Sequence, residues 1–502
     1  MPSPRRSSAP HRQSSPRSSS RGKKAGGSSK TPLYIALAVA GIAAIGGLVW
    51  WLLTPPSAPG FTPNALRDYV EAQPLPALLS DNSEAVYLDF SDGMNHAFAT
   101  PEAQAVLRDI TNKLNGPNVE FFSLANNKIS ELETGSVTQL YNTIMNPKSY
   151  LNHSAPIQMA LEQIAAGNRP ALLITDFEEY NNGQIQQAAY AKESFINWIA
   201  RGNNITFYSW DFTEKNKDKK LFIAVFDDQT NRLAYEIDQA IRQSNPAFID
   251  RFILCGKDFQ YPMKTIYTPE TSGGGFHNAD GVDIISGIDE RGEPESFTNY
   301  ASPIAASDGK GFYDQKNKRY GRFAQYYPVT FPWKNVVKNA RGYHPYKEGD
   351  PAEFHFLSKL FINFNSQQSF EIDDVEARVF NVEYAINDST GTAPTPELFG
   401  IFEADTEEIA LNDQEKWQEL IVDFDDNFDG IKFPAGTNPT DLMRINLIIA
   451  DANPRIEAAK RFFSWPGNNS LSASVVNTLQ SDAVNPKGTI LMSYYVKCLS
   501  NN

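Results

Sequence analysis

The chain has 502 residues, of which 41% are hydrophobic, 21% charged and 12% aromatic, and its formal net charge is −14. These proportions are typical of folded proteins and exclude a chain that is disordered throughout. Two cysteines in the whole chain exclude a disulfide framework and a cysteine-based zinc cluster, although one bridge between Cys255 and Cys498 and two separate thiols both remain open.

Charge is distributed unevenly along the chain. Residues 1–32 contain eight of the 45 Lys and Arg residues and no acid, so the remainder has 37 bases against 59 acids, a net charge of −22. A body this acidic is not expected to bind nucleic acid. We expect basic protein surfaces and cations as its partners.

Residues 33–53 read LYIALAVAGIAAIGGLVWWLL. A helix of about 20 apolar residues crosses a bilayer, so this segment predicts a single transmembrane helix. The basic tail before it places the N-terminus in the cytoplasm and the soluble body outside it. A cleaved signal peptide is the competing interpretation, but its apolar region is normally shorter and nearer the start. Ala36, Ala40 and Ala44 form a small-residue ladder that suits helix-mediated self-association.

The composition divides the chain into six parts. Residues 1–32 are rich in Ser, Pro, Lys and Arg and predict a disordered tail, and residues 54–81 are a Pro-rich stalk after the span. Strand and helix patterns alternate over 82–245, which predicts an α/β fold with a doubly wound parallel sheet. Residues 246–350 are loop-rich. Separated strand-like runs over 351–502 predict a β-rich, sandwich-like domain.

Polar side chains follow two predicted strands of the α/β region. Asp89 and Ser91 follow the apolar run at 85–90, and Asp176 follows the run at 171–175. In parallel α/β sheets, ligand sites form beyond the carboxyl ends of the strands. The three side chains are therefore expected on one rim of the sheet.

With these motifs, residues 82–245 resemble a von Willebrand factor A domain. The family has an Asp-x-Ser-x-Ser motif, a Thr before an Ile/Leu-x-x-Ala-Leu helix, and an Asp after a later strand. In this chain Gly93 replaces the second Ser, and Ala155 stands where the family has Thr, with Ser154 as a substitute beside the matching helix at 157–161. The resemblance implies a Mg²⁺ site at Asp89, Ser91, Ser154 and Asp176, where a carboxylate of a protein partner would complete the coordination.

A second acidic motif lies in the β-rich region. Asp425, Asn427 and Asp429 precede a Gly with the spacing of a calcium loop, which predicts a possible Ca²⁺ site. The twelfth position is Gly436 rather than Glu, and no helix pair flanks the motif. A solvated acidic turn between two strands is the competing interpretation.

These observations favour a membrane-anchored adhesion or assembly-scaffold protein over an enzyme. The sequence contains no nucleophile elbow, no phosphate loop and no paired metal-binding histidines. The alternative is a hydrolase of envelope polymers, with an aromatic groove in 257–350 and acids such as Asp289 and Glu290. A chaperone-type A domain that works with a cytosolic ATPase is disfavoured by the expected topology.

Overall fold

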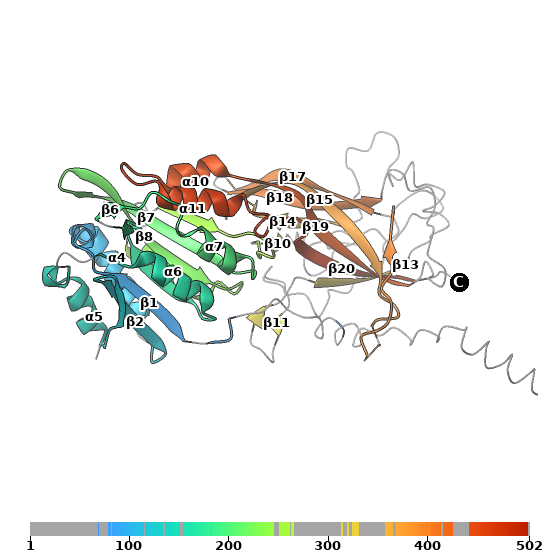
Figure 1. Ribbon diagram of the computed structural model, residues 1–502. Coiled ribbons are helices and arrows are strands. Elements are labelled where there is room, and N and C mark those ends of the chain that lie inside the picture. The colour runs from blue at the N-terminus through green and yellow to red at the C-terminus, as the bar shows by residue number, and fades with distance from the viewer. Residues whose placement is uncertain are drawn as a thin grey trace, which may run out of the picture. The chain divides into compact units, whose positions relative to one another are not determined.

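Figure 1 shows the computed structural model of the chain. Its secondary structure is described for residues 69, 79–265 (except 82, 115, 134–135, 151–153, 182, 245–249 and 262), 313–314, 319–320, 324–330 and 357–499 (except 365–367, 387, 389, 401, 413–414 and 425–440).

The expected transmembrane helix at 33–53, the tail before it and most of the stalk lie outside the described residues. In the part of the chain that the structure does describe, no helix is both long enough and apolar enough to cross a membrane. The single span therefore stays a prediction from the sequence.

A mixed seven-stranded sheet forms the core of the α/β region. The strand order is β3-β2-β1-β4-β8-β7-β9, and β1 pairs in parallel with both β2 and β4. Every residue of β1 and β4 is buried, as expected for strands covered on both faces. The bounds are β1 Glu84–Asp89, β2 Val119–Ala125, β3 Lys128–Glu131, β4 Ala171–Thr175, β7 Asn204–Glu214, β8 Lys217–Asp227 and β9 Asp250–Leu254.

Helices cover both faces of this sheet. Alternate residues of β1 point to opposite sides, so Val86 and Leu88 pack in one hydrophobic cluster and Ala85 and Tyr87 in the other. The first cluster includes side chains of α3 (Met94–Ala97), α4 (Pro101–Lys113), α5 (Val137–Ile144) and α8 (Arg232–Ser244), and the second includes α6 (Ile157–Ala166) and α7 (Lys192–Ile199). The predicted α/β layers are confirmed.

The prediction that the whole sheet is parallel is wrong. Strand β8 lies between β4 and β7 and runs antiparallel to both. The cause is a two-residue turn, because Lys215 and Asn216 both adopt left-handed backbone angles (φ 49° and 63°) that fold β7 directly back into β8. A loop of two residues joins antiparallel neighbours only, whereas parallel strands need a crossover of a dozen or more residues.

The C-terminal region contains separate β-sheets, as the sequence predicts. One has four strands in the order β10-β14-β18-β17, and the other has five in the order β13-β20-β19-β15-β16, with β13 and β20 parallel. The sandwich-like stacking of these sheets stays a prediction. Their bounds are β10 Met263–Thr265, β13 Ala324–Thr330, β14 Leu357–Ile362, β15 Phe370–Asn381, β16 Glu397–Leu398, β17 Phe402–Asn412, β18 Glu415–Phe424, β19 Leu442–Pro454 and β20 Ile490–Leu499; the short pairs are β5 Tyr180–Asn181 with β6 Gln184–Ile185, and β11 Tyr313–Asp314 with β12 Arg319–Tyr320.

Two C-terminal helices, which the sequence patterns did not predict, pack on the α/β sheet. In Figure 1, α10 (Ile456–Phe463) and α11 (Ser470–Leu479), in red, lie beside the green strands and α7. The Phe463 ring lies 4.9 Å from that of Phe207 and 5.0 Å from that of Phe252, measured between centroids. Asn468, between the two helices, donates a hydrogen bond from Nδ2 to the Phe177 carbonyl at 3.1 Å.

This packing predicts that a residue near the C-terminus stabilises the α/β region. Phe463→Ala should lower the free energy of unfolding by about 3–5 kcal/mol, because the variant loses the buried ring contacts and leaves a cavity. Urea unfolding followed by tryptophan fluorescence measures the change. The matched control is Phe399→Ala, because Phe399 is 79% exposed and its removal should cost almost nothing. Equal stability of the two variants would contradict the packing of α10 on the sheet.

Candidate functional site

The loop after β1 is held by the carboxylate of Asp89, the last residue of that strand. Asp89 Oδ1 accepts a hydrogen bond from the Ser91 backbone N–H at 2.7 Å, and Oδ2 accepts one from Thr175 Oγ1 at 2.6 Å. The side chain is buried, and burial raises the pKa of this carboxyl group above its ordinary value. Both oxygens of Asp89 thus have partners within the protein.

Asp176 follows β4, and because β1 and β4 are parallel neighbours it lies at the same edge of the sheet as Asp89. Its Oδ1 accepts a hydrogen bond from the Glu178 backbone N–H at 2.9 Å. Asp176 is only 2% exposed. Burial and the nearby charges of Asp89 and Glu178 raise its pKa well above the ordinary value, although Lys219 acts in the opposite direction.

Lys219 on β8 lies among three carboxylates. Its Nζ is 2.7 Å from Glu178 Oε2, 2.7 Å from Glu214 Oε2 and 3.8 Å from Asp176 Oδ2. Burial lowers the pKa of Lys219, but the charge of Asp176 and the hydrogen bonds to Glu178 and Glu214 outweigh it and raise the pKa above its ordinary value. The ammonium is therefore charged at neutral pH and offsets the negative charge of these acids.

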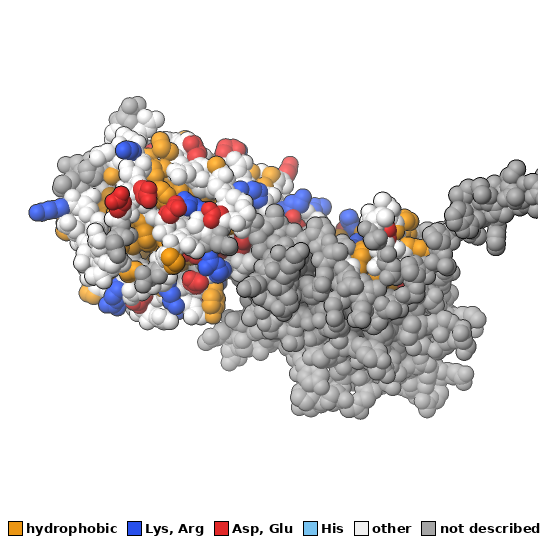
Figure 2. Space-filling model, turned by 90° about the horizontal axis from the view of Figure 1, so that it is seen from below, with side chains coloured by type: hydrophobic (Ala, Val, Ile, Leu, Met, Phe, Trp, Pro, Cys, Tyr) orange, Lys and Arg blue, Asp and Glu red, His pale blue; other side chains and the backbone are white. Residues whose placement is uncertain are grey.

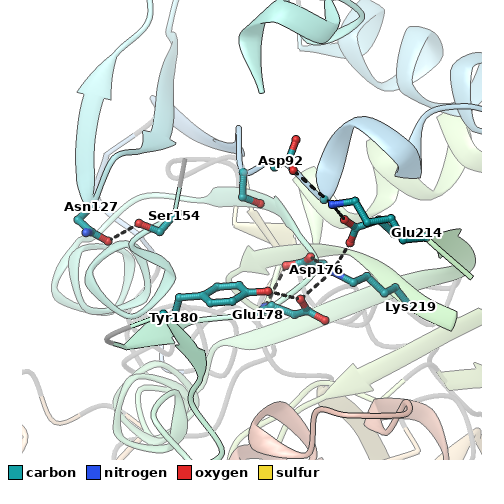
Figure 3. A pocket seen from close by; sticks show the side chains of 12 residues that line it. Asp92, Asn127, Ser154, Asp176, Glu178, Tyr180, Glu214 and Lys219 are labelled. Atoms are coloured by element: carbon teal, nitrogen blue, oxygen red, sulfur yellow. Dashed lines mark hydrogen bonds and ion pairs between the residues drawn. The ribbon is translucent and has the colours of Figure 1, made fainter. Parts of the chain in front are cut away.

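Ser154 and the turn after β2 form the opposite side of the site. Ser154 Oγ donates a hydrogen bond to Asn127 Oδ1 at 2.7 Å, and Asn127 has a left-handed backbone angle (φ 55°) in the turn between β2 and β3. In Figure 3 the two side chains point toward each other, on the opposite side of the view from Lys219. The hydroxyl of Ser154 thus binds an amide in this structure.

An open cavity of about 530 Å³ lies between these groups. Of the four residues that the sequence predicts for the site, Ser91, Ser154 and Asp176 line the cavity, whereas Asp89 is buried and does not. The complete lining is Ser91, Asp92, Gly93, Asn127, Ser154, Asp176, Glu178, Tyr180, Gly183, Glu214, Lys215 and Lys219. Sequence patterns missed Glu178, Tyr180, Glu214 and Lys219. A hairpin turn at Lys215 and Asn216, between two apolar runs, would have placed Glu214 and Lys219 next to each other.

The residues at this cavity do not fit a Mg²⁺ ion, which takes about six oxygen ligands in octahedral geometry. Position 93 supplies no side-chain oxygen, and the Ser154 hydroxyl and the Asp89 carboxylate have other partners. Among the described residues, no group of three or more His, Cys, Asp or Glu side chains is arranged to hold a metal ion. The prediction of Mg²⁺ therefore rests on the sequence pattern alone.

Other predicted features lie outside the described residues. These include the candidate calcium loop at Asp425, Asn427 and Asp429, and the acids Asp289 and Glu290. The side chains of the alternative aromatic groove are not described either; they are Phe276, Phe312, Tyr313, Tyr320, Phe323, Tyr326, Tyr327 and Trp333. Cys255 is buried and its burial raises the pKa of the thiol, while the side chain of Cys498 is not described. The disulfide, the calcium site and the groove all stay predictions.

Comparisons with protein-family models, with curated proteins and with solved structures found no match for this chain. The resemblance to von Willebrand factor A domains therefore rests on the motif residues alone.

The burial of Asp89 predicts a pH dependence of stability. Because its pKa is raised on folding, the folded protein keeps a proton that the unfolded chain releases above about pH 4. Raising the pH from there therefore lowers the free energy of unfolding until the folded-state pKa is passed. Asp89→Asn should flatten this decline, because the amide keeps both contacts: its oxygen accepts from Ser91 N–H, and its NH₂ donates to Thr175 Oγ1.

Urea unfolding at a series of pH values between 4 and 8 measures the two slopes. Asp92→Asn is the matched control, because 52% of the Asp92 side chain is exposed, and it should leave the slope unchanged. Parallel curves for the wild type and Asp89→Asn would show that Asp89 does not hold the extra proton.

Proposed function

We propose that this chain is a membrane-anchored, extracytoplasmic binding protein that recognises a protein partner, as an adhesion or assembly-scaffold component, through the rim of its α/β region. The observation that carries the proposal is the open cavity at the carboxyl ends of β1 and β4, where charged side chains from separate segments converge. Ligands of α/β sheets bind at this edge, because loops from neighbouring strands meet there.

The charge of the cavity supports a partner with a basic group. The lining contains four acids (Asp92, Asp176, Glu178 and Glu214) and two lysines, so acidic groups are in excess. The Lys219 ammonium is directed at Glu178 and Glu214, while Asp92 is half-exposed and its Oδ2 lies 3.7 Å from the exposed Lys215 Nζ. Exposed ion pairs contribute little to stability, so a partner's Lys or Arg can displace Lys215 at low cost.

Tyr180 supplies an aromatic surface beside these acids. Its hydroxyl donates a hydrogen bond to Glu178 Oε2 at 3.1 Å, which fixes the ring, and the residue is 37% exposed. A cationic group over an exposed tyrosine ring is attracted by the ring and by the acids around it. Figure 2 shows acidic and basic side chains near one another on the described part of one face.

The remaining parts of the chain fit the proposal. The predicted span at 33–53 would tether the body to the membrane, and the stalk at 54–81 would separate the two. The β-rich region would add binding surface or set the distance from the membrane. The resemblance to von Willebrand factor A domains agrees, since members of that family mostly mediate adhesion or assembly.

Photo-crosslinking at the rim tests the proposed function. Tyr180 is replaced by p-benzoylphenylalanine in cells that produce the protein, and we expect an adduct with a defined protein after irradiation. The matched control places the same group at Tyr235 on α8, which is 64% exposed and does not line the cavity. Adding Asp92→Lys should reduce the adduct about tenfold, because a reversed charge at the contact costs more than about 1.4 kcal/mol. Equal adducts at 180 and 235 would argue against the rim.

The orientation in the membrane has its own test. Protease added outside sealed cells or right-side-out vesicles should digest the body and leave a small N-terminal fragment that contains residues 33–53, because the basic tail stays inside. In inverted vesicles, whose cytoplasmic side faces outward, the same protease should leave the body intact. Protection of the body in the right-side-out sample would reverse the proposed topology.

A further inference from the structure

A side chain at position 93 would crowd the ammonium of Lys219 at the rim. A Cβ atom built on Gly93 would lie 3.2 Å from Lys219 Nζ, 3.2 Å from Glu214 Oε2 and 3.5 Å from Asp176 Oδ2. In the metal site that the sequence resemblance implies, the residue at this position carries a hydroxyl that binds the ion. Here the glycine leaves that space open, and the ammonium of Lys219 lies beside it.

The hairpin β7–β8 brings this ammonium to the rim. The last residue of β4, Thr175, pairs with Phe222, so the part of β8 before Phe222 extends past the end of β4. Lys219 lies in this extension and pairs across the hairpin with Phe212. Because β8 runs antiparallel to β4, the beginning of β8 and the carboxyl end of β4 lie at the same edge of the sheet.

The surroundings of Lys219 are those of a cation bound in a cage of oxygens. Glu178, Glu214 and Asp176 come from the loop after β4 and from the end of β7, and their side chains are at most 12% exposed. Carboxyl groups this close and this poorly hydrated repel one another when ionised, and a positive charge between them relieves that repulsion. Figure 3 shows the Lys219 side chain directed at these carboxylates.

We propose that the Lys219 ammonium is the built-in cation of this rim and takes the place of a divalent metal ion. The absence of a side chain at position 93 then leaves room for the Lys219 ammonium. The rim keeps its shape without added metal, and partner binding does not respond to divalent ions. This assignment rests on the rim that the proposed function uses. The following test needs no partner protein, so the assignment of Lys219 and the proposed function can fail independently of each other.

Thermal unfolding of the purified full-length protein in detergent, with and without millimolar Mg²⁺ or Mn²⁺, tests this assignment. The wild type should show no shift in Tm with either ion. Lys219→Ala should lower Tm by about 5–10 °C, because three buried carboxylates lose their counter-charge. Millimolar Mn²⁺ should then recover about 5 °C in this variant, because the ion occupies the vacated cage.

Lys220→Ala is the matched control. Lys220 is the next residue on β8, its side chain is 15% exposed, and its Nζ lies 3.7 Å from Asp211, away from the cavity. This variant should show no response to Mn²⁺. A response in Lys220→Ala equal to that of Lys219→Ala, or no response in either, would overturn the assignment.

If Lys219→Ala does not fold, Mn²⁺ binding to the wild type tests the assignment instead. Mn²⁺ binding to the wild type, seen by electron paramagnetic resonance and lost in Asp176→Asn, would overturn the proposal. Absence of that binding, together with a folded Lys219→Arg variant whose Tm stays unchanged in Mn²⁺, would support it, because arginine retains the positive charge that the carboxylates require.

Discussion

The ion cluster around Lys219 is the interaction on which the rim of this protein depends. Asp176, Glu178 and Glu214 are withdrawn from water, and a counter-charge stabilises the ionised forms of acids that lie this close together. The ammonium contacts Glu178 and Glu214 at 2.7 Å, so the loop after β4 and the end of β7 are held together by one side chain. The cavity lies against that junction, and its shape follows from the position of Lys219.

The strand that carries Lys219 also connects the rim to the C-terminal part of the chain. Three residues after Lys219, Phe222 packs against Phe463 with ring centroids 6.0 Å apart and against Trp465 at 5.5 Å. The helices α10 and α11 thus press on the buried face of the same hairpin whose extension reaches the cavity. Since the interior is closely packed, a displacement of α10 moves the hairpin as well. The α/β region and the C-terminal region consequently share one hydrophobic core.

The sequence predicts part of the site because that part obeys a simple rule. Asp89, Ser91 and Asp176 follow apolar runs that form parallel strands, and the carboxyl ends of parallel strands meet at one edge. Lys219 escapes prediction because a wholly parallel sheet, as the sequence predicts over 82–245, gives no reason to place the residues before the apolar run at 221–226 at the rim. A parallel strand would bring Asp227 to the rim, whereas the antiparallel β8 places Asp227 at the opposite edge, where it accepts a hydrogen bond from the Ala234 N–H. Strand direction depends on the turn at Lys215 and Asn216, which lacks the glycine that marks most such turns.

A lysine at this edge of the sheet recognises different ligands from those that a divalent metal ion would bind. A divalent ion with an open coordination position attracts a carboxylate of the partner, and its occupancy depends on the ion concentration. An ammonium has three protons, and in this cluster two of them are directed at Glu178 and Glu214, so little positive charge remains for a ligand. The acids beyond the cluster, such as Asp92, then determine the polarity of the surface. Under the proposed function, the edge of the α/β sheet that would bind an acidic group through a metal ion would therefore bind a basic group here, independently of divalent ions.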